Sequence, residues 1–144
     1  MTAYEEVSFP EPAGDEREMY VRWLGFLRGA VLRKALGLTD EQGRWRPDGK
    51  LLPLTGLVNH LTGVERRWIG HDEDKPADEY EPDLSMVDAI AAYRARGAAT
   101  DAHIRAAEIT PDLRFVLTHL INETARHAGH ADAVRELLDG TVGE

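Results

Sequence analysis

Residues 111–139 form a long stretch of helical periodicity, and three polar side chains fall within its apolar stripe. The apolar residues that recur there at intervals of three and four are Leu113, Val116, Leu120, Val134, Leu137 and Leu138. At about 100° per residue, Glu123, His127 and His130 lie on the same stripe. Polar groups that are buried without partners cost several kcal/mol. Because a metal ion would satisfy a carboxylate and imidazoles together, this segment predicts a metal site inside a helical fold.

The rest of the chain predicts three further amphipathic helices. Their expected ranges are about residues 15–36, 53–69 and 85–108. Pro111 suits the first turn of the last helix and Gly140 suits the position just past its end. No segment alternates polar and apolar residues as a half-buried strand would. We therefore expect an all-α protein, with residues 1–144 forming a single four-helix-bundle domain.

Two segments lack helical periodicity. Residues 1–14 carry Pro10 and Pro12 among acidic residues, and they predict an extended N-terminal arm with no apolar stripe for the core. Residues 70–83 are acidic and contain prolines, and they predict a long solvated loop that could act as a lid or rim.

The composition limits the classes of function. A net charge of −9 argues against a nucleic-acid surface, which would need a basic patch. No apolar run approaches the roughly 18 residues of a membrane span, and the N-terminus lacks signal-peptide features, so we expect a cytoplasmic protein. The chain has no cysteine, so a metal site must use nitrogen and oxygen ligands.

His60 is the best candidate for a ligand from another helix. Glu123 and His127 are four residues apart, which places them about 40° apart on the helix, so both can reach one point beside it. His60 is the histidine on the inner face of the expected helix 53–69. Two imidazoles and one carboxylate can bind zinc, nickel or iron and leave positions open for water or substrate.

The residues alone leave other readings open. Glu123 could instead pair with Arg94, which also lies near an inner face, while the histidines would be hydrogen-bonded core residues. His130 could be a further ligand, a hydrogen-bond partner of a ligand, an acid/base group near an open metal position, or a solvated histidine at the bundle end. His119 precedes Glu123 by one turn and is a reserve ligand.

Three arginines could bind an acidic substrate or a thiol cofactor, although solvated side chains are the simpler expectation. They are Arg66, Arg67 and Arg126.

Two runs of sequence resemble the DinB-like (YfiT-related) metalloprotein superfamily. Residues 57–68, LVNHLTGVERRW, resemble its second helix, and residues 119–132, HLINETARHAGHAD, resemble its fourth. The run ETARHAGHAD is similar to an actinobacterial branch that includes mycothiol-dependent S-transferases and is related to mycothiol-dependent maleylpyruvate isomerase. The resemblance covers nearly the whole chain beyond the N-terminal arm.

This resemblance implies a four-helix bundle, a homodimer and a divalent metal, with zinc the first choice. Members bind the metal through one residue of the second helix and through two residues of the fourth helix that are four positions apart. On this sequence these residues are His60, Glu123 and His127. Many relatives have glutamine at the position of His130, so its role is not inherited. The isomerase carries an additional C-terminal domain, whereas this sequence ends four residues after Gly140, which argues against isomerase activity.

The expected function is that of a divalent-metal-dependent thiol S-transferase. A low-molecular-weight thiol, mycothiol by resemblance, would coordinate the metal, become a thiolate and attack an electrophilic small molecule. His130 is the expected catalytic residue, which would accept a proton or orient a water. The alternatives are a metal-dependent hydrolase, an iron oxygenase with two histidines and one carboxylate, and a metal-binding stress or interaction protein without turnover.

Overall fold

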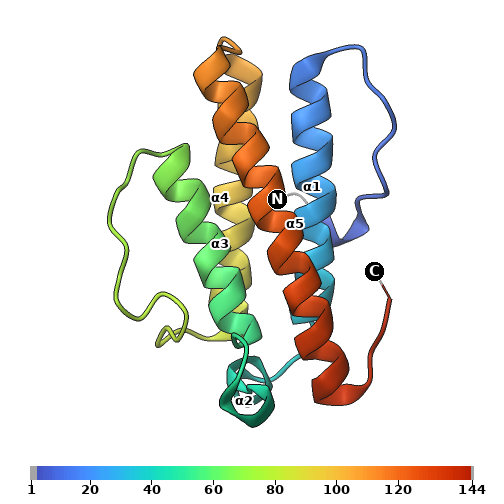
Figure 1. The fold of residues 1–144 in the computed structure, drawn as a ribbon, viewed down its shortest axis with the longest axis vertical. Coiled ribbons are helices and arrows are strands. Elements are labelled where there is room, and N and C mark those ends of the chain that lie inside the picture. The colour runs from blue at the N-terminus through green and yellow to red at the C-terminus, as the bar shows by residue number, and fades with distance from the viewer. Residues whose placement is uncertain (1–2, 144) are drawn as a thin grey trace.

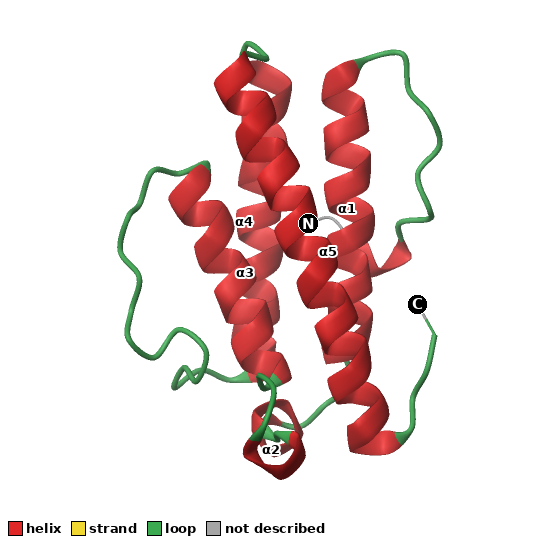
Figure 2. Cartoon of the chain, viewed as in Figure 1, coloured by secondary structure: helices red, strands yellow, loops and turns green. Residues whose placement is uncertain are grey.

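The computed structural model describes residues 3–143, and within them the secondary structure is helical, with no strand (Figures 1 and 2). Its long helices are α1 (Glu16–Ala35), α3 (Leu54–Trp68), α4 (Met86–Ala106) and α5 (Pro111–Asp139). The connections contain the short helix α2 (Asp40–Arg44) and the 3-10 turns η1 (Tyr4–Glu6) and η2 (Pro47–Gly49). The all-α prediction is confirmed, and each long helix begins and ends within two residues of its expected range.

Local side chains explain where the helices begin and end. The side chains of Asp15, Ser85 and Thr110 accept hydrogen bonds from backbone N–H groups at the starts of α1, α4 and α5. Such N-caps satisfy donors that a helix leaves without an internal partner. Gly140 follows α5 with a φ of 79°, a left-handed conformation that glycine adopts without strain.

Among the described residues, buried apolar side chains group into two clusters. One lies near the end of the bundle where α2 is found and includes Val31, Leu61 and Tyr93. The other lies toward the opposite end and includes Leu24, Ile69 and Ile104. On α1, α3 and α4, one buried charged residue lies near the boundary between these two clusters. These are Arg28, Glu65 and Asp101.

The buried charges form one ion cluster. The guanidinium of Arg28 donates to Glu65 through Nε at 3.0 Å and Nη2 at 2.8 Å, and to Asp101 through Nη1 at 2.8 Å. Burial alone would lower the pKa of Arg28, but the paired carboxylates, Glu65 above all, raise it well above its ordinary value. Since removal of one partner from a buried ion pair costs about 3–5 kcal/mol, this cluster ties α1, α3 and α4 together.

The N-terminal arm differs from its prediction. Tyr4 is buried, and its hydroxyl donates to Asp101 Oδ2 at 2.8 Å. A Cβ atom added at Gly29 would collide with the Tyr4 carbonyl, so the arm lies directly on α1. A single buried residue in an irregular segment has no periodicity, which is why the sequence did not indicate this contact.

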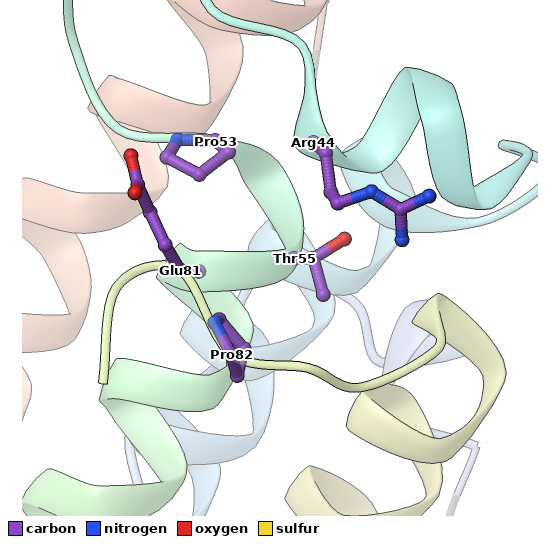
Figure 3. A pocket seen from close by; sticks show the side chains of 6 residues that line it. Arg44, Pro53, Thr55, Glu81 and Pro82 are labelled. Atoms are coloured by element: carbon purple, nitrogen blue, oxygen red, sulfur yellow. The ribbon is translucent and has the colours of Figure 1, made fainter. Parts of the chain in front are cut away.

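The connection between α1 and α3 holds α2 against the start of α3. Thr39 and Gln42 form a capping box, in which each side chain accepts a hydrogen bond from the other's backbone N–H. A cavity of about 270 Å³ lies where α2 meets the first turn of α3 and the chain before α4 (Figure 3). It is lined by Arg44, Pro53, Thr55, Gly56, Glu81 and Pro82. Because this lining offers one carboxylate and no imidazole, the cavity does not suit a transition metal.

We predict that Tyr4→Phe lowers the free energy of unfolding by about 1–3 kcal/mol, because it leaves a buried acceptor of Asp101 without its donor. Urea denaturation followed by circular dichroism measures the change. The control is Tyr20→Phe. The hydroxyl of Tyr20 donates to Glu16 at 3.3 Å in an exposed pair, so its removal should cost less than about 0.5 kcal/mol. Equal effects of the two substitutions would contradict the structural role of the arm.

Candidate metal centre

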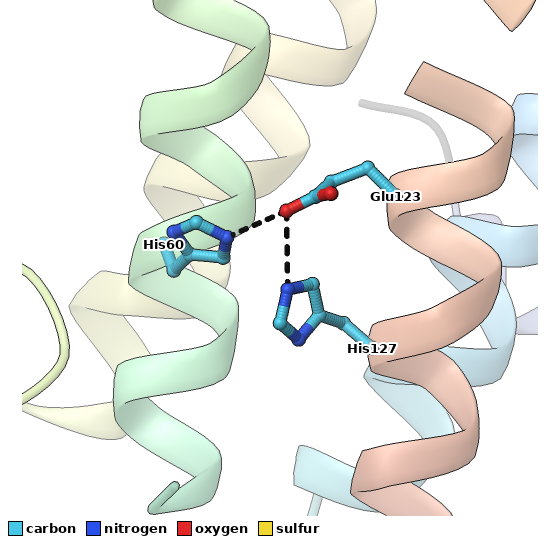
Figure 4. A group of neighbouring side chains, drawn as sticks. All are labelled: His60, Glu123 and His127. Atoms are coloured by element: carbon cyan, nitrogen blue, oxygen red, sulfur yellow. Dashed lines mark hydrogen bonds and ion pairs between the residues drawn. The ribbon is translucent and has the colours of Figure 1, made fainter. Parts of the chain in front are cut away.

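The side chains of His60, Glu123 and His127 meet between α3 and α5 (Figure 4). His60 Nε2 lies 3.0 Å from Glu123 Oε1, and His127 Nε2 lies 3.2 Å from the same oxygen. One ligand atom from each residue lies within 4.8 Å of the other two. His60 is buried, whereas Glu123 and His127 are partly exposed. The structure therefore brings together the three side chains that the sequence singled out.

The hydrogen-bonding capacity of His60 fits a cation at this point. Its Nδ1 lies 2.8 Å from Glu79 Oε2, so both ring nitrogens face carboxylate oxygens. A neutral imidazole carries one N–H, so one of these contacts would bring two acceptors together unless a cation or a second proton lies there. Donor atoms on one tetrahedral zinc ion lie roughly 3.3–3.6 Å apart, given bonds of about 2.0–2.2 Å. The donor set thus suits a divalent ion, and the nitrogen–oxygen separations of 3.0 and 3.2 Å lie within a few tenths of an ångström of that spacing.

The pKa shifts also favour ligands in their metal-binding forms. Burial alone would raise the pKa of Glu123, but the hydrogen bond from His60 and the charge of His127 outweigh it and lower the pKa below its ordinary value. Burial, together with the charge of His60, lowers the pKa of His127. Metal ligands must be an ionised carboxylate and a neutral imidazole. Both residues hold these forms at neutral pH.

The alternative in which Glu123 pairs with Arg94 is wrong. Arg94 donates instead to the carboxylate of Glu5 at 2.7 Å. Glu5 belongs to the N-terminal segment that was expected to have no part in the core, so the sequence gave no reason to consider it as the partner.

The two other histidines of the α5 motif occupy different surroundings. His119 packs against Trp68, with ring centroids 4.7 Å apart, and does not join the group of three. His130 lies beside His127, with centroids 6.1 Å apart and ring planes 14° from parallel. Burial lowers the pKa of His130, so its imidazole is neutral at neutral pH. His130 is therefore available as a proton acceptor, while His119 is part of an aromatic contact.

An open cavity of about 490 Å³ adjoins the group, lined by Glu123, Arg126, His127 and His130. The three arginines that were candidates for substrate binding have different surroundings. Arg66 pairs with Asp72 at 3.1 Å, and Arg67 pairs with Glu79. Arg126 is exposed and lines the cavity beside the group of three.

Sequence reasoning missed Glu79. Residues 70–83 were expected to be solvated throughout, and most of them are exposed, but Glu79 is 2% exposed and contacts His60 directly. Gly56 and Gly63 are seven positions apart on α3, and this pair of small residues was the signal in the sequence that another segment lies close to the helix.

The comparison with protein families agrees with this geometry. A family model described as Mycothiol-S-transferase matches residues 19–140, which include His60, Glu123 and His127. No curated protein and no solved structure matched the chain. Among the described residues, no helix is both long and apolar enough to cross a membrane. Because the matched segment spans most of the sequence, the chain belongs to the mycothiol-S-transferase family.

Proposed function

We propose that this protein is a divalent-metal-dependent thiol S-transferase that joins mycothiol to an electrophilic small molecule. The observation that carries the proposal is the group of His60, Glu123 and His127 at the wall of an open cavity, within a chain of the mycothiol-S-transferase family. The proposal also includes a cytoplasmic location and a homodimer.

In this proposal, His60 Nε2, Glu123 Oε1 and His127 Nε2 hold the ion. Zinc suits two imidazoles and one carboxylate with a further position open, and nickel and iron are the alternatives. The ion would lower the pKa of a coordinated thiol, so that the sulfur is a thiolate at neutral pH. The chain has no cysteine, which fits a reaction whose sulfur comes from a cosubstrate.

The cavity residues have separate roles in the reaction. A bond forms between the thiol sulfur and the electrophilic carbon, and the electron pair of the broken bond departs with the leaving group. The neutral imidazole of His130, which lines the same cavity as His127, accepts the thiol proton. Arg126 also lines this cavity, where its positive charge could bind an acidic group of a substrate or of the thiol.

The metal assignment predicts the composition of the purified protein. We expect a divalent metal in near-stoichiometric amount, and we expect His127→Ala to lose most of it, because two ligands bind far more weakly than three. Elemental analysis by mass spectrometry measures the content. His119→Ala is the matched control on the same helix and should retain the metal, since His119 packs on Trp68. Equal metal content in both variants would contradict the assignment.

The reaction class predicts a thiol requirement. Metal-loaded protein, incubated with mycothiol and 1-chloro-2,4-dinitrobenzene, should form the thioether and release chloride faster than a protein-free control. The absorbance of the thioether measures the rate of the reaction, and the same mixture without thiol should form no thioether. Hydrolysis of the electrophile without thiol would favour the metal-dependent hydrolase. If the metal-loaded protein catalyses neither conjugation nor hydrolysis, it is a metal-binding protein without turnover.

A further inference from the structure

The loop of residues 70–83 has one buried side chain, and it reaches the candidate metal centre. Glu79 Oε2 lies 2.8 Å from His60 Nδ1. Both terminal nitrogens of Arg67 donate to the same carboxylate, and the ring of Tyr80 lies 4.7 Å from that of His60. Glu79 therefore contacts the nitrogen of His60 that faces away from Glu123 and His127.

The surface of α3 is shaped to receive this loop. A Cβ atom added at Gly63 would collide with the Glu79 carboxylate, and one at Gly56 would collide with the Tyr80 carbonyl. Between these two positions, Asn59 Nδ2 donates to the Glu79 carbonyl at 2.8 Å. Three positions of one helix thus contact Glu79 and its neighbour Tyr80, and two of them contact Glu79 itself. Such specific contacts indicate a defined position for the carboxylate within an otherwise exposed loop.

The hydrogen bonds of Glu79 determine which nitrogen of His60 carries the proton. Both terminal nitrogens of Arg67 donate to the Glu79 carboxylate, and such a paired guanidinium favours the ionised carboxylate. An ionised carboxylate only accepts hydrogen bonds, so the facing Nδ1 must carry a proton. A neutral His60 then has its lone pair on Nε2, which points to Glu123 and His127.

We propose that Glu79 is a positioning residue: it fixes His60 as the Nδ1–H tautomer and thereby prepares Nε2 as a metal ligand. The proposal rests on the metal centre assigned under the proposed function. Hydrogen-bond partners of metal-bound histidines commonly raise metal affinity by about 10–100-fold. Arg67 acts with Glu79, because its two donors keep the carboxylate ionised and correctly oriented.

Glu79→Gln tests the tautomer directly. Arg67 has only donors, so the amide oxygen of the new side chain should face Arg67 and its NH₂ group should face His60 Nδ1. This arrangement favours the Nε2–H tautomer, which places a proton where the metal would bind. Nitrogen-15 NMR of the imidazoles in the metal-free protein should report a proton on Nδ1 of His60 in the wild type, whether or not Nε2 also carries one, and a proton on Nε2 alone in Glu79→Gln. A wild-type His60 found as Nε2–H would overturn the proposal.

Zinc affinity provides the second measurement. In competition with a chromophoric chelator, Glu79→Gln should bind Zn²⁺ about 10–100-fold more weakly than the wild type. Glu81→Gln is the matched control in the same segment, because Glu81 is exposed, pairs with Arg46 and should leave the affinity unchanged. Glu79→Asp retains a charged acceptor and should lose less affinity than Glu79→Gln.

A purely structural role for Glu79 gives a different pattern. If the loop contact only stabilises the fold, Glu79→Gln and Glu79→Asp should lower the unfolding midpoint of the metal-free protein and leave the zinc affinity within about twofold of wild type. That result overturns the proposal. These readouts require no turnover, so a failure of the S-transferase proposal would leave the tautomer test intact.

Discussion

The arrangement of this bundle depends on how α3 places its charged side chains. Glu65, on one side of the helix, accepts two hydrogen bonds from Arg28 of α1 inside the core. His60 lies five residues earlier, about 140° around the helix, and faces Glu123 of α5. Because a buried ion pair leaves little freedom to rotate or slide the helix, the Glu65–Arg28 contact also sets the direction of His60.

The part of the α3 surface next to His60 accommodates the loop that leads to α4. Gly56 and Gly63 have no side chain at the places where Tyr80 and Glu79 approach. The same helix therefore contacts the core through Glu65, the facing helix through His60 and the loop through its glycines. Glu79 is distant from α5 in the sequence, but α3 brings it beside His60. It can therefore determine which ring nitrogen of His60 carries the proton where α3 meets α5.

The helices and the group of three were predictable because their signals are local. Periodicity, N-caps and the four-residue spacing of Glu123 and His127 depend on one helix at a time, and His60 stood out as an imidazole on an inner face. Tyr4 and Glu79 were not predictable in this way, since each is a single buried residue in an irregular segment. Their partners, Asp101 and His60, become visible only when the packed helices are seen together.

Apolar character alone also misled at two positions. Val87 and Trp68 recur at the helical spacing of the apolar residues in their helices, but Val87 is 75% exposed and Trp68 is 40% exposed. Trp68 lies at the end of α3, where it contacts His119 and leaves part of its ring in solvent. At the ends of a bundle fewer neighbours cover a helix, so a side chain on the apolar stripe need not be buried.

The most direct test of this account is crystallography of the metal-loaded protein, with anomalous diffraction recorded on both sides of the absorption edge of the bound metal. We expect one strong anomalous peak in each protein chain, bounded by His60 Nε2, Glu123 Oε1 and His127 Nε2. An absence of any peak at these three atoms, in crystals of protein that elemental analysis shows to contain the metal, would contradict it.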